Sequence, residues 1–355
     1  MNMEGFADTH VHVKYEENDK TIAMFDEIKS KGVTDIAIQA LVKFGDYGIL
    51  QNIAALNYKM TYKGLKIRAF GNIDDIGPFK HVPYERQAEA LLDMGCDGIK
   101  MLNQKPDTRK RFGKGINHNS YDAMFSLLEE RGTPVLIHSG DPEDNWDITK
   151  VSPNAVARGW FYGDGTFLTP EEIYAEDFEM LDKHPNLNVT FAHFFFLSNK
   201  LEEAIRVFEK YPNVKFDLTP GGEMFYGFSK DIDAWHDFFE KYSDRILFGT
   251  DSFPLKDCNG QLNDLVLKAI SNNKEIFSTP CYGRDFVIRG LGLSKETVNK
   301  IKYENFVKFV GGENVAPIDV DKLKVAANEI LKVINDKPEE AHNVHWINNF
   351  LAENK

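Results

Sequence analysis

The sequence predicts a (β/α)8 barrel, and three observations support this prediction. Eight short apolar runs recur between Gly5 and Phe253, and segments with helical spacing fall between them. Several of the runs are apolar on both faces, as parallel strands covered by helices are. The chain has 355 residues, a length at which such barrels form one domain. A doubly wound parallel sheet is the second fold that fits this alternation.

The expected strands follow one another at fairly regular spacing. They are GFADTHVHV from Gly5, TDIAIQALV from Thr34, LKIRAFGNI from Leu65, CDGIKML from Cys96, TPVLIHSG from Thr133, NVTFAHFFF from Asn188, NVKFDLTPG from Asn213 and DRILFGTDS from Asp244. Glycines at Gly32, Gly95 and Gly132 end three of the helical segments between them, which is where glycine suits a helix terminus. Thr169 and Pro170 have the chemistry of a helix start.

One connection is unusually long, from Ser139 to Leu187, and contains DPEDNW and ARGWFYGDGTF. Long ordered loops are often lids over a binding site, but an insertion of this kind can equally cover the barrel and only add stability. After Phe253 the pattern is mainly helical. We expect a barrel over residues 1–312 and, over residues 313–355, a helical extension that packs on it.

Charge and cysteine content exclude several classes of function. The formal net charge of −13 repels phosphate backbones and anionic membranes, so neither nucleic acid nor a membrane is an expected partner. The three cysteines have no CxxC spacing, which argues against a disulfide framework. The N-terminus enters a strand without a signal segment, and no apolar stretch is long enough for a bilayer. The sequence predicts a cytoplasmic protein, with a homo-oligomer left open.

The first predicted strand holds two histidines, His10 and His12. Side chains alternate along a strand, so both point to one face together with Asp8, and in a barrel that face is the interior. Buried polar groups without partners cost about 1–3 kcal/mol each. A metal ion bound by both imidazoles would remove that cost.

Four more polar residues interrupt or end apolar strands: Lys100, His138, His193 and Asp251. All lie near the C-terminal ends of predicted strands, where barrel enzymes place their chemistry. Taken singly, each has a common structural explanation as a hydrogen-bonded core histidine, a helix-capping aspartate or an ion-paired lysine. Together with the histidine pair they predict a functional site.

With these residues the chain resembles the amidohydrolase superfamily of metal-dependent barrel hydrolases. The resemblance runs through DTHVHV, GIKM, LIHSGDP, TFAHF, FGTDSFP and IKYENFVKFVG, and its wording is closest to the amidohydrolase-related (amidohydrolase 2) branch. It implies that His10, His12 and His138 are metal ligands. It also implies that Asp251 both touches the metal and accepts a proton.

Two residues have alternative roles within that family. The position of His193 is catalytic in members with one metal and a ligand in members with two. The position of Lys100 holds a carboxylated, metal-bridging lysine in binuclear members and an unmodified lysine in many members of the related branch. The resemblance favours one divalent ion, with Zn²⁺ the best match for imidazoles plus a carboxylate, and two ions are the alternative.

The implied reaction is hydrolysis of a small-molecule ester, lactone or amide by a metal-activated water. Asp251 would then move the proton, and His193 and Lys100 would stabilise the oxyanion. A non-oxidative decarboxylase on the same metal is the first alternative; some such relatives have Glu in place of the first histidine, so His10 favours hydrolysis. A barrel that binds without catalysis is the second.

Loops at the strand ends are expected to select the substrate. The basic run NQKPDTRKR would suit an anionic substrate, although such a run is more often a solvated surface. The residues expected to contact the substrate are Lys43 and Phe44, Asn103 to Arg111, Asp141 to Trp146, Trp160, Tyr162 and Tyr226.

Overall fold

The computed structural model describes residues 5–41, 48–219, 222–254, 259–272, 275–279 and 286–354. Its centre is one eight-stranded sheet with strand order β1 to β8, and every neighbouring pair is parallel. The strands are β1 (Ala7–His12), β2 (Asp35–Gln39), β3 (Lys66–Asn72), β4 (Gly98–Gln104), β5 (Val135–Ser139), β6 (Val189–Phe191), β7 (Lys215–Asp217) and β8 (Ile246–Leu247). Seven lie within the runs identified from the sequence, and β4 extends two residues beyond its run, so the (β/α)8 prediction is confirmed.

The barrel closes between β1 and the chain that follows β8. Val11 and Ser252 form a parallel bridge there. The backbone N–H of Thr9 donates to the Phe248 carbonyl at 3.0 Å, and that of His12 donates to the Ser252 carbonyl at 2.7 Å. This closure places the residue before Ser252, Asp251, beside the histidines of β1.

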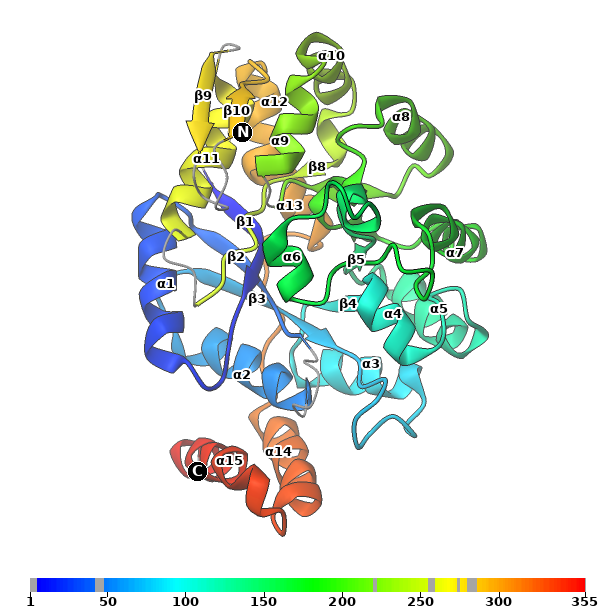
Figure 1. Ribbon diagram of the computed structural model, residues 1–355. Helices are drawn as coiled ribbons and strands as arrows, with labels where there is room; N and C mark the ends of the chain where they lie inside the picture. The colour runs from blue at the N-terminus through cyan, green and yellow to red at the C-terminus, as the bar shows by residue number, and fades with distance from the viewer. Residues whose placement is uncertain are drawn as a thin grey trace.

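Helices surround the sheet (Figure 1). The main ones are α1 (Asn18–Ser30), α2 (Gly48–Thr61), α3 (Tyr84–Met94), α5 (Asp122–Arg131), α7 (Pro170–Lys183), α8 (Leu201–Lys210), α10 (Ile232–Lys241) and α11 (Asn259–Ser271). Gly95 and Gly132 follow α3 and α5 in left-handed conformation, with φ of 109° and 62°. α7 begins with the expected cap, in which Thr169 and Glu172 form a reciprocal capping box.

The amino-terminal end of the barrel is filled by apolar side chains that include Phe306 and Phe309 of α13 (Asn305–Phe309). Arg68 is fully buried there and donates to Asp35 at 3.0 Å and to the Gly312 carbonyl at 2.9 Å. A buried guanidinium is tolerated because it is paired in this way. This end of the barrel is therefore a packed core, and the chemistry lies at the other end.

The segment after Phe253 contains more than helices. β9 (Ile276–Thr279) and β10 (Phe286–Arg289) pair antiparallel in a second, two-stranded sheet. The sequence predicted mainly helical structure here, because four-residue apolar runs are too short to show a strand period.

Two helices, α14 (Val320–Ile334) and α15 (Ala341–Glu353), follow the barrel and lie at its side in Figure 1. α14 contacts α2 and α3. The backbone N–H of Ala316 donates to Asp97 at 2.8 Å, and Tyr15 donates to Asn343 on α15 at 2.7 Å. These contacts join the extension to the barrel, and the boundary at residues 312 and 313 stays a prediction. No helix in the described ranges is both long and apolar enough to cross a bilayer.

The long connection after β5 is ordered. It contains a short turn of helix at Glu143–Trp146, then α6 (Pro153–Ala157), then α7. Asp177 of α7 is fully buried and accepts a short hydrogen bond from Ser139, the last residue of β5. Burial raises the pKa of Asp177 well above its ordinary value, so the folded protein favours the neutral acid.

Asp177 should make folding stability depend on pH. Unfolded chains release this proton near the ordinary pKa of 3.8, whereas the folded protein keeps it at higher pH. The contribution of Asp177 to the free energy of unfolding is therefore complete below pH 3.8. It is lost as pH rises, by up to about 1.4 kcal/mol per pH unit. We expect Asp177→Asn to remove this loss, so the stability of the variant relative to wild type should increase with pH in urea unfolding. Glu171→Gln, an exposed change on the same helix, is the control, and parallel pH profiles for wild type and Asp177→Asn would contradict the assignment.

Candidate active site

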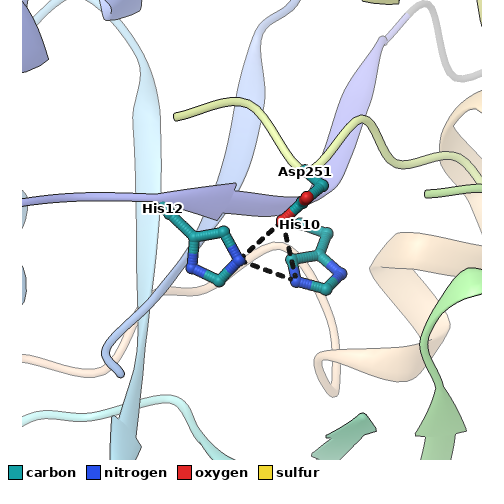
Figure 2. A group of neighbouring side chains, drawn as sticks. All are labelled: His10, His12 and Asp251. Atoms are coloured by element: carbon teal, nitrogen blue, oxygen red, sulfur yellow. Dashed lines mark hydrogen bonds and ion pairs between the residues drawn. The ribbon is translucent and has the colours of Figure 1, made fainter. Parts of the chain in front are cut away.

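Three predicted site residues converge at the carboxyl end of β1. His10 and His12 project from β1 into the barrel, and Asp251 approaches from the chain after β8 (Figure 2). The two Nε2 atoms lie 3.1 Å apart, and Asp251 Oδ1 lies 2.7 Å from His12 Nε2 and 3.8 Å from His10 Nε2. The three potential ligand atoms all lie within 4.8 Å of one another.

Hydrogen bonds on the far side of each ring fix its tautomer. Nδ1–H of His10 donates to Asp217 Oδ2 at 3.0 Å, and Nδ1–H of His12 donates to the Gln39 carbonyl at 3.3 Å. In the neutral form of each ring Nε2 is then the acceptor, and the two Nε2 lone pairs face each other beside a carboxylate oxygen. Three acceptors in contact repel one another unless a cation lies between them. Ligands about 2.0–2.2 Å from a tetrahedral zinc ion are themselves roughly 3.4 Å apart, so this donor set fits one.

Burial keeps the imidazoles in the form that binds metal. It lowers the pKa of His10 well below its ordinary value, with the charge of nearby Lys100 acting in the same direction. Burial also lowers the pKa of His193, to about 3, and that of His138. Neutral imidazole is the ligand form of histidine, so the site needs no deprotonation of these rings near neutral pH.

Lys100 of β4 reaches the same place from across the barrel. Its Nζ lies 3.1 Å from His10 Nε2, and the side chain is almost completely buried. Burial lowers the pKa of Lys100 to about 7, although Asp217 and Asp251 favour the charged form. Near neutral pH the amine is thus divided between a cation, which can donate to an oxyanion, and a free base.

His138 and His193 form a second acceptor pair beside the first. Nε2–H of His138 donates to the Gly140 carbonyl at 3.1 Å, and Nδ1–H of His193 donates to the Thr219 carbonyl at 2.9 Å. The remaining nitrogens, His138 Nδ1 and His193 Nε2, are 3.0 Å apart with their lone pairs facing. The His10 and His193 rings are 5.6 Å apart, centre to centre. The two acceptor pairs are neighbours.

The backbone is left-handed where two of these side chains leave the barrel. His193 to Phe196 all have φ between 52° and 58°, and Asp251 has φ of 50°. Such a conformation costs roughly 1–2 kcal/mol for each non-glycine residue. Phe194 and Phe195 are fully buried among other aromatic rings, which offsets this cost and turns His193 and Phe196 toward the site.

The chain after β8 comes unusually close to β7. A Cβ atom on Gly249 would lie 2.4 Å from Cγ2 of Thr219, so only glycine fits there. Thr250 then donates to the fully buried Asp8 at 2.6 Å. Burial raises the pKa of Asp8 to about 7. These contacts fix the path of the chain that presents Asp251.

The insertion after β5 is joined to the site through Asp141. This carboxylate lies 3.4 Å from His138 Nε2, accepts a hydrogen bond from Tyr162 at 2.5 Å and forms a short ion pair with Lys105. Lys105 in turn lies 4.5 Å from the centre of the Trp160 ring. Burial would raise the pKa of Asp141, but Lys105 and His138 outweigh it and lower that pKa. The insertion thus contacts the residues around His138 directly.

The basic run predicted from the sequence is largely used inside the protein. Arg109 forms two hydrogen bonds to Glu176 of α7, at 2.6 and 2.8 Å, and Lys110 donates to Thr166 at 2.6 Å. With Lys105 paired to Asp141, these cations hold the insertion against α4 (Pro106–Phe112), the helix that follows β4. The structure thus gives the run a structural role that was not predicted from the sequence, and its contact with an anionic substrate stays a prediction.

The structure therefore brings the predicted site residues to one end of the barrel in two groups. His10, His12, Asp251 and Lys100 form the first, and His138 faces His193 in the second. His138 as a ligand in the first group stays a prediction. Tyr226 is 44% exposed, and Lys43 and Phe44 lie outside the described residues.

Two residues that position the site were missed in the sequence analysis. Asp217 ends β7 and accepts from His10, and Thr219 follows it, with its hydroxyl 3.1 Å from His10 Nδ1 and its carbonyl bound to His193. A signal was present, because Asp217 is an acidic residue that closes the apolar run NVKFD, as Asp251 closes its own run.

The geometry defines a barrel with a polar, imidazole-rich centre at the carboxyl ends of its strands. The sequence model of the amidohydrolase family matches residues 66–311, a stretch that includes Lys100, His138, His193 and Asp251. The chain belongs to the amidohydrolase family. His10 and His12 of β1 precede the matched region, and the structure places them beside Asp251 and Lys100.

Solved structures with the same fold are distant in sequence. A putative amidohydrolase from Staphylococcus aureus is 18% identical with a TM-score of 0.55, and the match covers 86% of this chain and 99% of that one. IDCase from Metarhizium anisopliae is 13% identical with a TM-score of 0.54, and the match covers 87% of this chain and 97% of that one. 4-Oxalomesaconate hydratase from Rhodopseudomonas palustris is 10% identical with a TM-score of 0.51, and the match covers 92% of this chain and 99% of that one. Curated proteins give no match.

Asp217→Asn should weaken metal binding. Asp217 Oδ2 accepts from His10, while Oδ1 accepts from the backbone N–H of His193 at 2.8 Å and from the Thr219 hydroxyl at 2.5 Å. An asparagine can accept at only one of these positions and must oppose a donor at the other. We expect about 10- to 100-fold weaker zinc binding, as for other partners of ligating histidines, measured by competition with a chromophoric chelator. The exposed Asp244→Asn is the control, and a change under about threefold would contradict the role.

Proposed function

We propose that this protein is a metal-dependent hydrolase of a small-molecule ester, lactone or amide. The observation that supports it most is the meeting of His10 Nε2, His12 Nε2 and Asp251 Oδ1, three potential ligand atoms that all lie within 4.8 Å of one another. Membership of the amidohydrolase family supports the same proposal. The proposed cofactor is a divalent cation, with Zn²⁺ the best match for this donor set.

His10, His12 and Asp251 would hold the cation, and His138 with His193 offers a second position. A bound divalent cation lowers the pKa of a water molecule to about 7 and polarises a carbonyl oxygen. One ion is the simpler assignment. The facing lone pairs of His138 and His193 support two, in which case Lys100 would be a carboxylated bridge.

Asp251 is the proposed proton carrier. Its carboxylate lies at the open end of the barrel, 25% exposed, so it can reach an attacking water as well as the site. It would accept a proton from that water as the carbon–oxygen bond forms and return it to the leaving oxygen or nitrogen. Asp217, the carboxylate on the far side of His10, is less suited to this step because it already accepts from His10, His193 and Thr219.

Lys100 is better placed than His193 to stabilise an oxyanion. Protonated Lys100 can donate to oxygen, and its Nζ is directed at the centre of the site. Neutral His193 has its only N–H bonded to the Thr219 carbonyl and presents a lone pair at Nε2. We therefore assign His193 as an acceptor or second-ion ligand in preference to an oxyanion donor, which refines its predicted catalytic role.

Decarboxylation on the same donor set is the second candidate. IDCase and 4-oxalomesaconate hydratase share the fold, so this barrel is not restricted to hydrolysis. In a decarboxylase Asp251 would deliver a proton to the carbon that loses CO₂. The two reactions differ in product, and CO₂ release from carboxylic acids, measured beside acid release from esters and lactones, separates them.

Metal content tests the cofactor directly. Protein purified without chelator should contain about one equivalent of zinc or another divalent metal by plasma mass spectrometry, and His10→Ala/His12→Ala should lose it. The surface change His342→Ala/His345→Ala is the matched control. About two equivalents would assign the second ion to His138 and His193. Metal-free wild type would remove the proposed mechanism.

Asp251→Asn tests the proton carrier. The amide keeps the size of the side chain but cannot accept a proton, so turnover should fall by about 10²- to 10⁴-fold on any substrate found. Metal content measured on the same samples separates loss of the proton carrier from loss of the ion. An Asp251→Asn variant with wild-type turnover would contradict this role.

A further inference from the structure

Lys14 lies two residues after His12, a member of the first group. β1 ends at His12 and Lys14 follows it by two residues, just as Phe253 follows Asp251 by two residues. The Phe253 ring is 6.2 Å from the His12 ring, centre to centre, and Lys14 Nζ lies 5.4 Å from the centre of the Phe253 ring. The Phe253 ring is therefore a neighbour of both the His12 ring and the Lys14 ammonium.

The Lys14 ammonium has no carboxylate partner within the described parts of the chain. Nearby Glu17 pairs with Lys20 at 3.0 Å instead. Two other lysines of the barrel are neutralised by carboxylates, Lys59 by Asp97 at 2.6 Å and Lys105 by Asp141. Lys14 is only partly exposed, and its one recorded side-chain contact is the face of an aromatic ring. In a chain with a net charge of −13, an unpaired ammonium beside the site is a distinctive feature.

We infer that Lys14 binds an anionic group of the substrate. This inference rests on the proposed function and specifies its substrate class. The substrate would be a small molecule that carries a carboxylate or phosphate a few bonds from the reacting carbonyl, with the intervening part against Phe253. Lysine suits this task because its ammonium is a compact point charge that accepts either anion without the fixed bidentate geometry of arginine.

The ring of Phe253 helps to define where the anion binds. A cation within about 6 Å of a ring centre is attracted to the ring face, which limits the positions of the flexible lysine side chain. The ammonium still has three N–H donors. The segment after β4, where the sequence placed the basic run, offers less, because Lys105 and Arg109 already pair with Asp141 and Glu176.

The test uses three small acids that share one carboxylate and differ at the other end: succinate, succinamate and 3-phosphonopropionate. Their dissociation constants are measured by calorimetry on the zinc-loaded protein, for wild type, Lys14→Met and the control Lys20→Met. Wild type and Lys20→Met should bind succinate or 3-phosphonopropionate about tenfold more tightly than succinamate, and Lys14→Met should lose this preference. The better of the two acids distinguishes a carboxylate from a phosphate.

The inference is overturned if wild type shows no preference for the second anion, or if Lys14→Met keeps it within about twofold. Hydrolysis of the neutral ester 4-nitrophenyl acetate by wild type is measured separately. If wild type hydrolyses the ester but Lys14→Met keeps the preference for the second anion, the anion site is contradicted and the proposed reaction is not. If the preference for the second anion depends on Lys14 but the protein does not hydrolyse the ester, the anion site is supported and the proposed reaction is contradicted.

Discussion

The contact between the Nε2 atoms of His10 and His12 is the constraint on which the rest of the site depends. Two imidazole nitrogens 3.1 Å apart beside a carboxylate are stabilised by a cation between them, and the hydrogen bonds on the far side of each ring hold both rings in place. Asp217 fixes one tautomer and the Gln39 carbonyl fixes the other. These hydrogen bonds hold the two Nε2 atoms close together, which is the arrangement that a metal ion between them requires.

The barrel supplies the rigidity that this arrangement requires. The residues come from β1, β4, β5, β6 and β7 and from the chain after β8, so no local segment could assemble them. Parallel register brings the carboxyl ends of the strands to one edge, and bonds such as His12 N–H to the Ser252 carbonyl close the circle. Left-handed residues at His193 and Asp251 add local strain, which the buried Phe194 and Phe195 rings and the Asp8–Thr250 contact offset.

The sequence predicted the fold and also the residues that make up most of the candidate site, because both leave signals along the chain. Apolar runs locate the strands, and strand alternation places His10 and His12 on one face. The tautomers were not predictable, since they depend on Asp217 and Gln39, which lie far away in sequence. The β9–β10 pair was missed because its strands are too short for a period to show. The ion pairs of NQKPDTRKR were not predictable either, because charge alone cannot reveal that Glu176 and Asp141 are its partners.

The insertion after β5 shows why a lid and a stabilising cover are not separate possibilities here. Ser139 and Asp177 join it to the end of β5, and Arg109 and Glu176 join it to α4, which are stabilising contacts. Asp141 at its start contacts His138 and is held by Tyr162 from its middle. A displacement of the insertion would therefore disturb the carboxylate beside His138. The same segment that covers the barrel also helps to orient a histidine of the site, so its packing and its function depend on the same bonds.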